Sequence, residues 1–156
     1  MIADLRTYVV RPTLQLLNPE IAYTESSVEL VMRTGAQETQ FNYLDQLGPG
    51  EGPGFGFWQM EKFTHDDLWA TFLNSRPALA AKVRLTMAPW PVGAEQLHTN
   101  VAYGAAMCRV RYYRAPEHVP AIDDIAGMAN FWKLRYNAGG RGTVAEFIAN
   151  AALVRV

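Results

Sequence analysis

Glu38 is the residue whose type and place in the chain point most directly to chemistry. Steps of three and four along a helix put Val28, Val31, Gly35 and Glu38 on one face, which is otherwise apolar. The carboxyl group is therefore expected to point toward the protein interior. Burial disfavours the carboxylate anion and raises the pKa of the acid. Glu38 is thus a candidate for an acid that keeps its proton near neutral pH and donates it.

A glycine-rich stretch follows Glu38 closely. Residues 45–56 hold five glycines and two prolines, which predicts a loop or a small irregular hairpin near residues 45–57. The stretch has no Gly-Lys-Ser/Thr ending, so a phosphate-binding loop is not expected. It leads into the aromatic turn Gly56-Phe57-Trp58-Gln59-Met60. An acid beside a loop and an aromatic turn suggests a carbohydrate cleft, because breaking a glycosidic bond requires an acid to protonate the leaving oxygen.

Helical periodicity dominates the rest of the chain, and alternating strand patterns are almost absent. We therefore predict a mainly α-helical single domain, residues 1–156, with at most a small β-hairpin near residues 45–57. Three starts carry capping residues: Ser26 or Ser27 for the second helix, Thr64 with Asp67 for the third, and Thr143 for the last. The expected helices span residues 2–17, 26–44, 64–74, 77–87, 94–114, 119–136 and 144–154.

Charge and composition exclude several classes of function. The 156 residues include 14 basic and 15 acidic side chains, which gives a net charge of −1. No global field favours nucleic acid or an anionic membrane, so neither is expected as a partner. Arg109, Arg111 and Arg114 form a local basic cluster, which we interpret as a solvated helix face.

The sequence gives no indication of a disulfide, a metal or another cofactor. Cys108 is the single cysteine, so an intramolecular disulfide is excluded, and its apolar neighbours suggest that it packs in the core. His65, Asp66 and Asp67 are consecutive, and consecutive residues point in different directions on a helix. No metal site and no cofactor are therefore expected.

The N-terminal segment lacks the pattern of a secretory signal. It carries Asp4 early and has no long apolar region that ends in small residues. No stretch approaches the roughly eighteen apolar residues that a membrane-spanning helix needs. We expect synthesis in the cytoplasm without a signal peptide.

Four separate segments resemble, in order, motifs of the SLT-type, lysozyme-like lytic transglycosylases. Ala36–Phe41 resembles the family's Gln-Glu-Ser-x-Phe motif, and Gly56–Met60 resembles its Gly-Leu-Met-Gln-Leu segment, with Thr64 on the threonine that follows. Asn100–Gly104 resembles its Asn-Ile-x-x-Gly helix, and Tyr136–Gly139 matches its Tyr-Asn-Ala-Gly turn. The resemblance covers roughly residues 30 to 145.

The resemblance implies a lysozyme-like fold and cleavage of the β-1,4 bond between N-acetylmuramic acid and N-acetylglucosamine in peptidoglycan. Glu38 would be the catalytic acid and then the base, and Tyr136 would position it. The residues implied in substrate binding are Gln59, Tyr136, Asn137, Trp58 and Thr39. Lys62 and Gly140 stand where the family usually or often has proline, and Thr39 replaces a serine, so the resemblance implies a distant branch.

Two mechanisms and one non-enzymatic role stay open at this stage. A transglycosylase requires no second carboxylate, whereas a lysozyme requires one, for which Asp45, Glu51 and Glu61 are available. The absent export signal and the departures at Thr39 and Lys62 also suit a catalytically inactive structural or wall-binding protein that retains the fold.

The stretch from Gly56 to Trp69 also resembles small proteins of tailed bacteriophages. This second resemblance implies a protein that is associated with the virion and acts at the bacterial cell wall. Its expected partners are the peptidoglycan glycan strand and other virion proteins.

Overall fold

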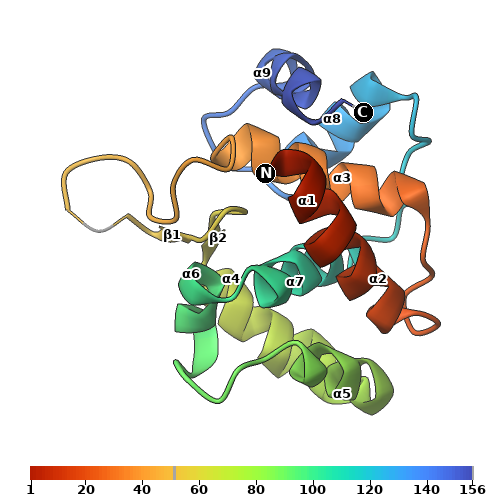
Figure 1. The fold of residues 1–156 in the computed structure, drawn as a ribbon, viewed down its shortest axis with the longest axis vertical. Helices are drawn as coiled ribbons and strands as arrows, with labels where there is room; N and C mark the ends of the chain where they lie inside the picture. Colours follow the sequence, from red (N-terminus) through yellow and green to blue (C-terminus); the bar gives the residue numbers. More distant parts are fainter. Residues whose placement is uncertain (51, 156) are drawn as a thin grey trace.

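The computed structural model describes residues 1–50 and 52–155, and it is mainly helical with one small antiparallel sheet (Figure 1). The prediction of a mainly α fold with a small hairpin is confirmed. Strands β1 (Gly54–Phe55) and β2 (Met60–Glu61) pair Gly54 with Glu61 and Phe55 with Met60. The hairpin therefore extends to Glu61, slightly beyond the predicted residues 45–57. Asp45 adds an isolated bridge to Phe55.

The helical elements follow one another with short connections. Leu5–Val10 and Leu68–Phe72 are wider, π-type turns, and each continues the α-helix before it. In chain order the elements are α1 (Ile2–Asp4), η1 (Leu5–Val10), α2 (Arg11–Leu17), α3 (Glu25–Glu38), α4 (Lys62–Asp67), η2 (Leu68–Phe72), η3 (Leu73–Ser75), α5 (Pro77–Leu85), η4 (Gly93–Glu95), α6 (Gln96–Thr99), α7 (Val101–Tyr113), α8 (Ile125–Arg135), α9 (Val144–Asn150) and η5 (Ala151–Val154).

Helix α3 ends at Glu38, six residues earlier than predicted. The side chain of Thr24 accepts a hydrogen bond from the Ser27 backbone N–H and caps the start of the helix. At the other end Gln40 and Phe41 adopt left-handed backbone angles, with φ of 53° and 58°. Two left-handed residues in succession cannot continue a right-handed helix. Glu38 is therefore the last residue of α3.

Two further predicted helices differ in extent from the observed ones. The predicted helix 94–114 is divided at Asn100, because the Asn100 side chain accepts a hydrogen bond from the Tyr103 N–H and starts α7 as a new helix. The predicted helix 119–136 begins only at Ile125, where Asp124 provides the cap. Residues 119–124 connect the two helices as turns and extended chain.

The sequence predicted the start of the last helix correctly, but not the start of the helix that contains Thr64. Helix α4 begins at Lys62 rather than Thr64, and the Thr64 side chain makes no capping bond. Helix α9 begins as predicted, with a reciprocal capping box between Thr143 and Glu146.

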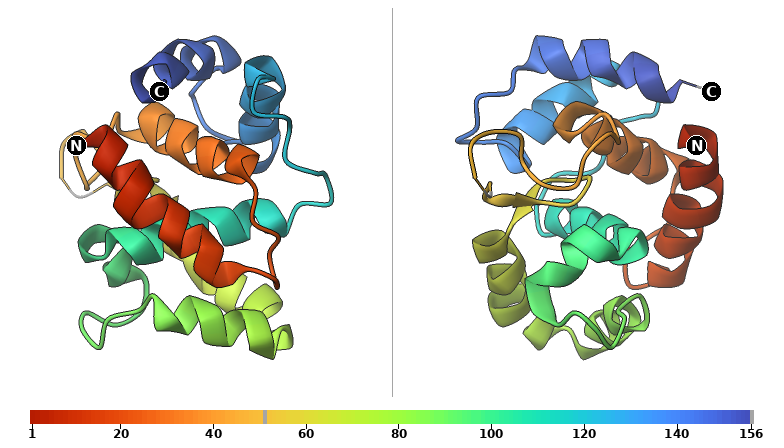
Figure 2. Two further views of the ribbon diagram at one scale, coloured as in Figure 1. Left: turned by 45° about the vertical axis from the view of Figure 1, so that its right-hand side comes forward. Right: turned by 60° about the vertical axis from the view of Figure 1, so that its left-hand side comes forward.

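Helix α7 runs through the middle of the molecule between two hydrophobic cores (Figures 1 and 2). The first core, around α3, α8 and α9, receives Ala105, Cys108 and Tyr112 from α7. The second core, around η2, η3 and α5, receives Tyr103, Ala106, Met107 and Val110 from α7. The hairpin lies at one side of the molecule between these two regions, beside the end of α3.

The N-terminal helix and the C-terminal turn lie on the same side of the molecule, against α3 (Figure 2). The Arg6 guanidinium donates hydrogen bonds both to the Glu29 carboxylate and to the Val154 carbonyl. No helix in residues 1–50 or 52–155 is long and apolar enough to cross a membrane.

Candidate functional site

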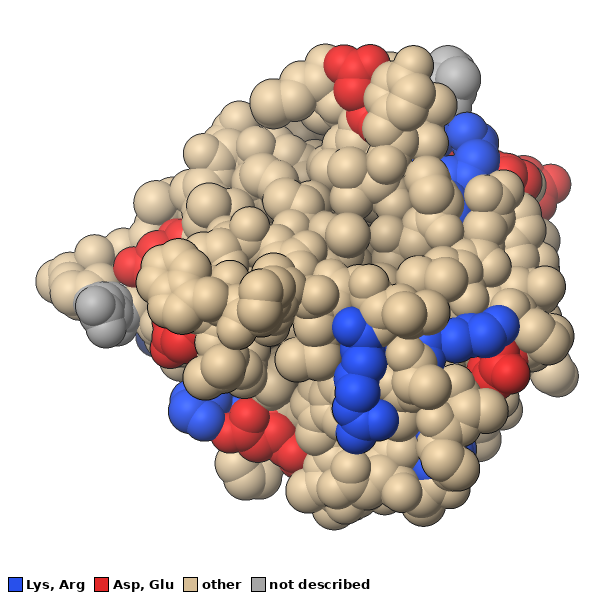
Figure 3. All heavy atoms as spheres, turned by 60° about the horizontal axis from the view of Figure 1, so that its bottom comes forward, with Lys and Arg blue, Asp and Glu red and all other residues tan. Residues whose placement is uncertain are grey.

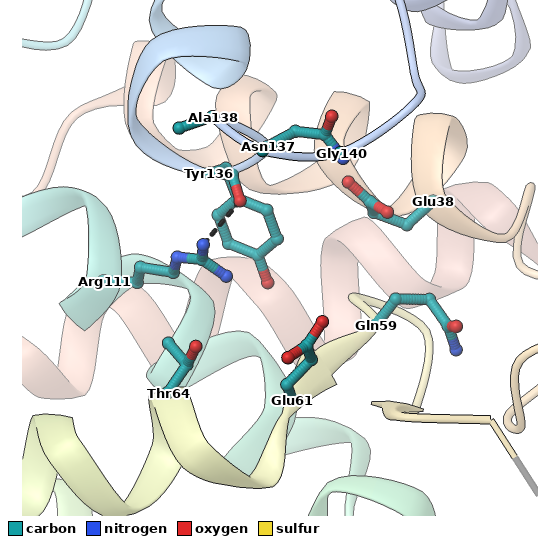
Figure 4. Close-up of a pocket in the computed structure, with 10 residues that line it drawn as sticks. Glu38, Gln59, Glu61, Thr64, Arg111, Tyr136, Asn137, Ala138 and Gly140 are labelled. Atoms are coloured by element: carbon teal, nitrogen blue, oxygen red, sulfur yellow. Dashed lines mark hydrogen bonds between the residues drawn. The ribbon is translucent and has the colours of Figure 1, made fainter.

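A cleft lies between the end of α3, the hairpin and the chain that follows α8 (Figure 4). Two neighbouring cavities of about 380 and 640 Å³ form it. They share five lining residues: Glu38, Gln59, Glu61, Asn137 and Gly140. Thr64, Arg111 and Tyr136 line only the first cavity, and Tyr43, Gln46 and Arg141 line only the second. Glu38 therefore stands where the two halves of an elongated cleft meet.

The carboxyl group of Glu38 has the properties of an acid that is protonated near neutral pH. Burial raises its pKa from 4.5 to about 7, and this effect exceeds the opposing effects of a hydrogen bond from Trp132 and the charge of Arg111. Part of the side chain nevertheless reaches the cleft. A proton held on this carboxyl group can therefore pass to a bound molecule.

Trp132 orients the Glu38 carboxyl group. Its indole Nε1–H donates a hydrogen bond of 2.8 Å to Glu38 Oε1. The Trp132 side chain is fully buried and packs on Phe147, with 5.3 Å between the ring centroids. A rigid indole thus holds one carboxyl oxygen, while the other has no protein donor among the described residues.

Tyr136, expected to position Glu38, instead supports the neighbouring turn. Its hydroxyl donates a hydrogen bond of 2.8 Å to the Trp58 carbonyl and is buried. Burial raises the pKa of this phenol well above its usual value, so it stays protonated. The positioning of Glu38 belongs to Trp132, one helical turn earlier on α8.

Trp58 and Thr39 lie beneath the cleft and not in it. Trp58 is 3% exposed, and its indole donates a hydrogen bond to the Val31 carbonyl. It packs against α7 at Gly104, where an added Cβ would lie 3.0 Å from the indole ring. Thr39 is fully buried, and its hydroxyl donates to the Phe57 carbonyl over 2.9 Å. Both residues therefore support the cleft from beneath, and neither lines its two cavities.

Gln59 and Asn137 do line the cleft, on opposite sides of Glu38 (Figure 4). The Gln59 amide nitrogen donates to the Gly56 carbonyl over 2.9 Å, so the turn itself holds this side chain. The Asn137 amide oxygen accepts a hydrogen bond of 3.1 Å from Lys133, which leaves the amide N–H₂ group for other acceptors. The structure thus brings Glu38, Gln59, Tyr136 and Asn137 together around one cavity.

Backbone strain concentrates at this site. Among residues 1–50 and 52–155, the non-glycine residues with positive φ are Gln40, Phe41 and Gln59. Two of them follow Glu38 within three residues, and the third lines the cleft. Such conformations cost about 1–3 kcal/mol each and persist where the surrounding structure enforces them, often at functional sites. Gly35 contributes to this arrangement, because an added Cβ would lie 2.4 Å from the Phe41 ring.

The three acids considered for a hydrolytic mechanism have different positions. Glu61 is exposed and lines both cavities of the cleft (Figure 4). Asp45 forms the bridge to Phe55 and lines neither cavity. Glu51 lies outside the described residues. Glu61 is therefore the acid that faces Glu38 across the cleft.

Three residues of the site were not expected from the sequence. Neither Trp132 nor Tyr43 was among the candidate site residues, and Arg111 was interpreted as part of a solvated helix face. Trp132 precedes Tyr136 by four residues, so a predicted helix places both on one face, and this spacing was the available signal. Tyr43 donates a hydrogen bond of 2.9 Å to the Glu38 carbonyl, which no spacing rule indicates.

The described part of the chain contains no group of three His, Cys, Asp or Glu side chains that could hold a metal ion. His65 is buried, with hydrogen bonds of 2.8 and 2.7 Å to Asp66 and Tyr103. On the face in Figure 3, Lys and Arg side chains are separated by uncharged surface and in several places lie beside acidic side chains. This face carries no continuous basic surface.

Compared with protein-family models, curated proteins and solved structures, the chain matches none. The resemblance to lytic transglycosylases therefore rests on the four sequence segments. Three of those segments contribute Glu38, Gln59 and Asn137 to one cleft. The fourth, at Asn100, starts α7 and lies outside the cleft residues.

Proposed function

We propose that this protein cleaves the β-1,4 bond between N-acetylmuramic acid and N-acetylglucosamine in peptidoglycan, as a lytic transglycosylase with Glu38 as its catalytic residue. The observation that carries the proposal is the Glu38 carboxyl group, whose pKa lies at about 7, at the junction of two cavities. An elongated cleft with an acid at its middle suits a chain of sugars that is cut internally.

The reaction assigns two successive roles to Glu38. The protonated carboxyl group first donates its proton to the glycosidic oxygen, and the bond from that oxygen to the muramoyl C1 breaks. The resulting carboxylate then takes the proton of the muramoyl 6-hydroxyl while this oxygen bonds to C1. The products are a 1,6-anhydromuramoyl end and a new N-acetylglucosamine end, and Glu38 regains its proton. The reaction requires no second carboxylate and consumes no water.

The protein groups around Glu38 support these roles. The Trp132 N–H bond favours the anion that forms after the first proton transfer. Burial favours the protonated acid that starts the reaction. A pKa of about 7 balances the two requirements, because an acid that must also act as a base works best near the working pH.

A hydrolytic, lysozyme-type reaction is the second candidate, and the position of Glu61 favours it. Glu61 lines both cavities opposite Glu38, where it can activate a water molecule. The two reactions give different ends. Transglycosylation gives anhydro ends, and hydrolysis gives reducing ends.

Digestion of purified peptidoglycan followed by mass spectrometry tests the proposal. We expect anhydro ends from the wild type and from Glu61→Gln, and intact peptidoglycan with Glu38→Gln. Reducing ends that disappear in Glu61→Gln would replace the transglycosylase assignment with the hydrolytic one. If wild type and Glu38→Gln leave peptidoglycan equally intact, the enzymatic proposal fails and a structural or wall-binding role takes its place.

A further inference from the structure

A small basic pocket lies beside the cleft. It has a volume of about 180 Å³ and is lined by Arg111, Arg114, Ala115, Pro116, Leu134 and Arg135. Arg111 lines both this pocket and the first cavity of the cleft. The Arg111 side chain is therefore common to the walls of the cleft and of the basic pocket, and the two are neighbours.

The three arginines of the basic pocket are held in place by separate partners. Arg114 donates a hydrogen bond of 2.7 Å to Asp67, and Arg135 forms a two-pronged pair with Glu117. Arg111 donates to the Tyr136 carbonyl and lies over the Tyr136 ring, 4.1 Å from its centroid. Their planar donor groups are thus ordered before a ligand arrives, which lowers the entropic cost of binding.

The charges of the basic pocket are not balanced. Three guanidinium groups face the two carboxylates of Asp67 and Glu117, which are more than a quarter exposed. Within residues 1–50 and 52–155, Arg111 forms no ion pair with a carboxylate. An exposed ion pair contributes little, so a guanidinium group can keep its partner and still accept a second anion. The pocket is therefore suited to one further carboxylate.

The remaining lining favours a peptide over a free inorganic anion. Ala115, Pro116 and Leu134 provide a smaller, apolar part of the lining beside the three cationic groups. Leu134 is 57% exposed, so its side chain is available for contact. A short peptide with small apolar side chains and a carboxylate matches both halves of this lining.

We propose that the basic pocket binds a carboxylate of the stem peptide that branches from the muramoyl residue in the cleft. This inference rests on the proposed function. Because a guanidinium group matches a carboxylate with two parallel hydrogen bonds, the pocket selects glycan strands that carry acidic stems over strands without them.

The test compares initial rates on two substrates, stem-bearing glycan strands and strands from which an amidase has removed the stems. We expect the wild type to prefer stem-bearing strands by about tenfold, equivalent to one well-formed charged hydrogen-bonded contact. The double variant Arg114→Gln, Arg135→Gln should reduce this ratio to about twofold or less. Arg11→Gln, which removes an equally exposed pair with Glu25 on the N-terminal side of the molecule, should leave the ratio unchanged.

A binding measurement separates this inference from the proposed function. The free stem peptide is titrated into the wild type and both variants, with binding followed by NMR. Peptide binding that weakens only in the double variant supports the inference even if neither strand is cleaved, in which case the proposed function alone fails. Cleavage of both substrates at equal rates, or equal peptide binding by the wild type and the double variant, overturns the inference.

Discussion

Helix α3 carries two glutamates, Glu29 and Glu38, in opposite settings. Glu29 is 6% exposed and accepts two hydrogen bonds from the equally buried Arg6, and Arg33 lies 3.9 Å away. Glu38 receives one neutral hydrogen bond from Trp132 and faces a cleft. The two carboxyl groups lie nine residues apart on one helix. An arginine pairs with Glu29, whereas Glu38 has no such partner and its pKa is raised.

The difference shows how one helix serves stability at one end and chemistry at the other. The buried ion pair between Glu29 and Arg6 links the N-terminal helix to α3 and, through the bond from Arg6 to Val154, to the C-terminal turn. A buried carboxyl group with only a dipolar partner keeps its proton instead.

Substitution of Glu38 tests the chemical end of the helix and has the largest expected effect. Glu38→Gln should lower the rate of peptidoglycan cleavage by at least about 10³-fold, because the amide has no acidic proton to donate. Glutamine still accepts the Trp132 hydrogen bond, so the fold should be retained. Circular dichroism and the rate of release of soluble fragments measure the two properties.

The same variant has a pH-dependent effect on stability, with a sign that follows from the raised pKa. The folded protein holds the Glu38 proton more tightly than the unfolded chain does. The contribution to stability is therefore complete below pH 4.5 and is lost as the pH rises through about 7. Urea unfolding should show Glu38→Gln gaining stability relative to the wild type between pH 5 and pH 8. A constant difference across this range would contradict the assignment.

Substitution of Glu29 tests the structural end. Glu29→Gln should lower the free energy of unfolding by about 3 kcal/mol, because it leaves the buried Arg6 without a carboxylate. The rate per folded molecule should stay unchanged under conditions where the variant is folded. Chemical denaturation and cleavage assays of the same sample measure both. A large loss of rate without a loss of stability would remove the contrast between the two ends.

Trp132→Phe sharpens the contrast by removing the one hydrogen-bond donor to the Glu38 carboxyl group within residues 1–50 and 52–155. We expect a loss of about tenfold in rate and about 1–2 kcal/mol in stability. The hydrogen bond from Trp132 lowers the pKa of Glu38, so its removal should shift the decline of activity with rising pH to higher pH. Rates measured between pH 5 and pH 9 give the profile.

Trp58→Phe is the matched control for this variant. Trp58 is also a buried indole with one hydrogen bond, but its acceptor is the Val31 carbonyl. Trp58→Phe should lose a similar amount of stability, and the pH profile of its cleavage rate should match that of the wild type. Equal shifts in both variants would mean that packing, and not the bond to Glu38, sets the profile.

The smallest effects concern the backbone at the two ends of α3. Tyr43→Phe removes the hydrogen bond to the Glu38 carbonyl, and Thr24→Ala removes the cap at the start of the helix. Each should cost about 1 kcal/mol of stability. Only Tyr43→Phe should also lower the rate, by about twofold, because it alone lies at the cleft. Thermal unfolding and cleavage rates compare the two.

The sequence was sufficient for features that depend on local rules. The capping residues of the last helix, the buried face of α3 and the mainly helical class follow from spacing and residue type. The end of α3 did not follow, because Gln40 and Phe41 are residues that do not favour left-handed angles. Packing of Phe41 against Gly35 enforces that turn, and packing of this kind is not visible in sequence spacing.

The motif residues of the candidate site could be named from the sequence, but the hydrogen bonds that hold them could not. Glu38, Gln59 and Asn137 meet in the cleft as the resemblance implied. The bond from Trp132 to Glu38 joins positions 94 residues apart, and among four tryptophans only the four-residue spacing from Tyr136 points to this one. Trp58, beside the glycine-rich loop, was the more conspicuous candidate, yet its indole is satisfied within the core.

Direct titration of the Glu38 carboxyl group tests the central claim. Carbon NMR of the wild type with isotopically labelled glutamate, compared with Glu38→Gln to assign the signal, follows this one group through pH. We expect a midpoint at about pH 7. A midpoint near the ordinary value of 4.5 would contradict it, because Glu38 would then be ionised at neutral pH and could not act as the acid.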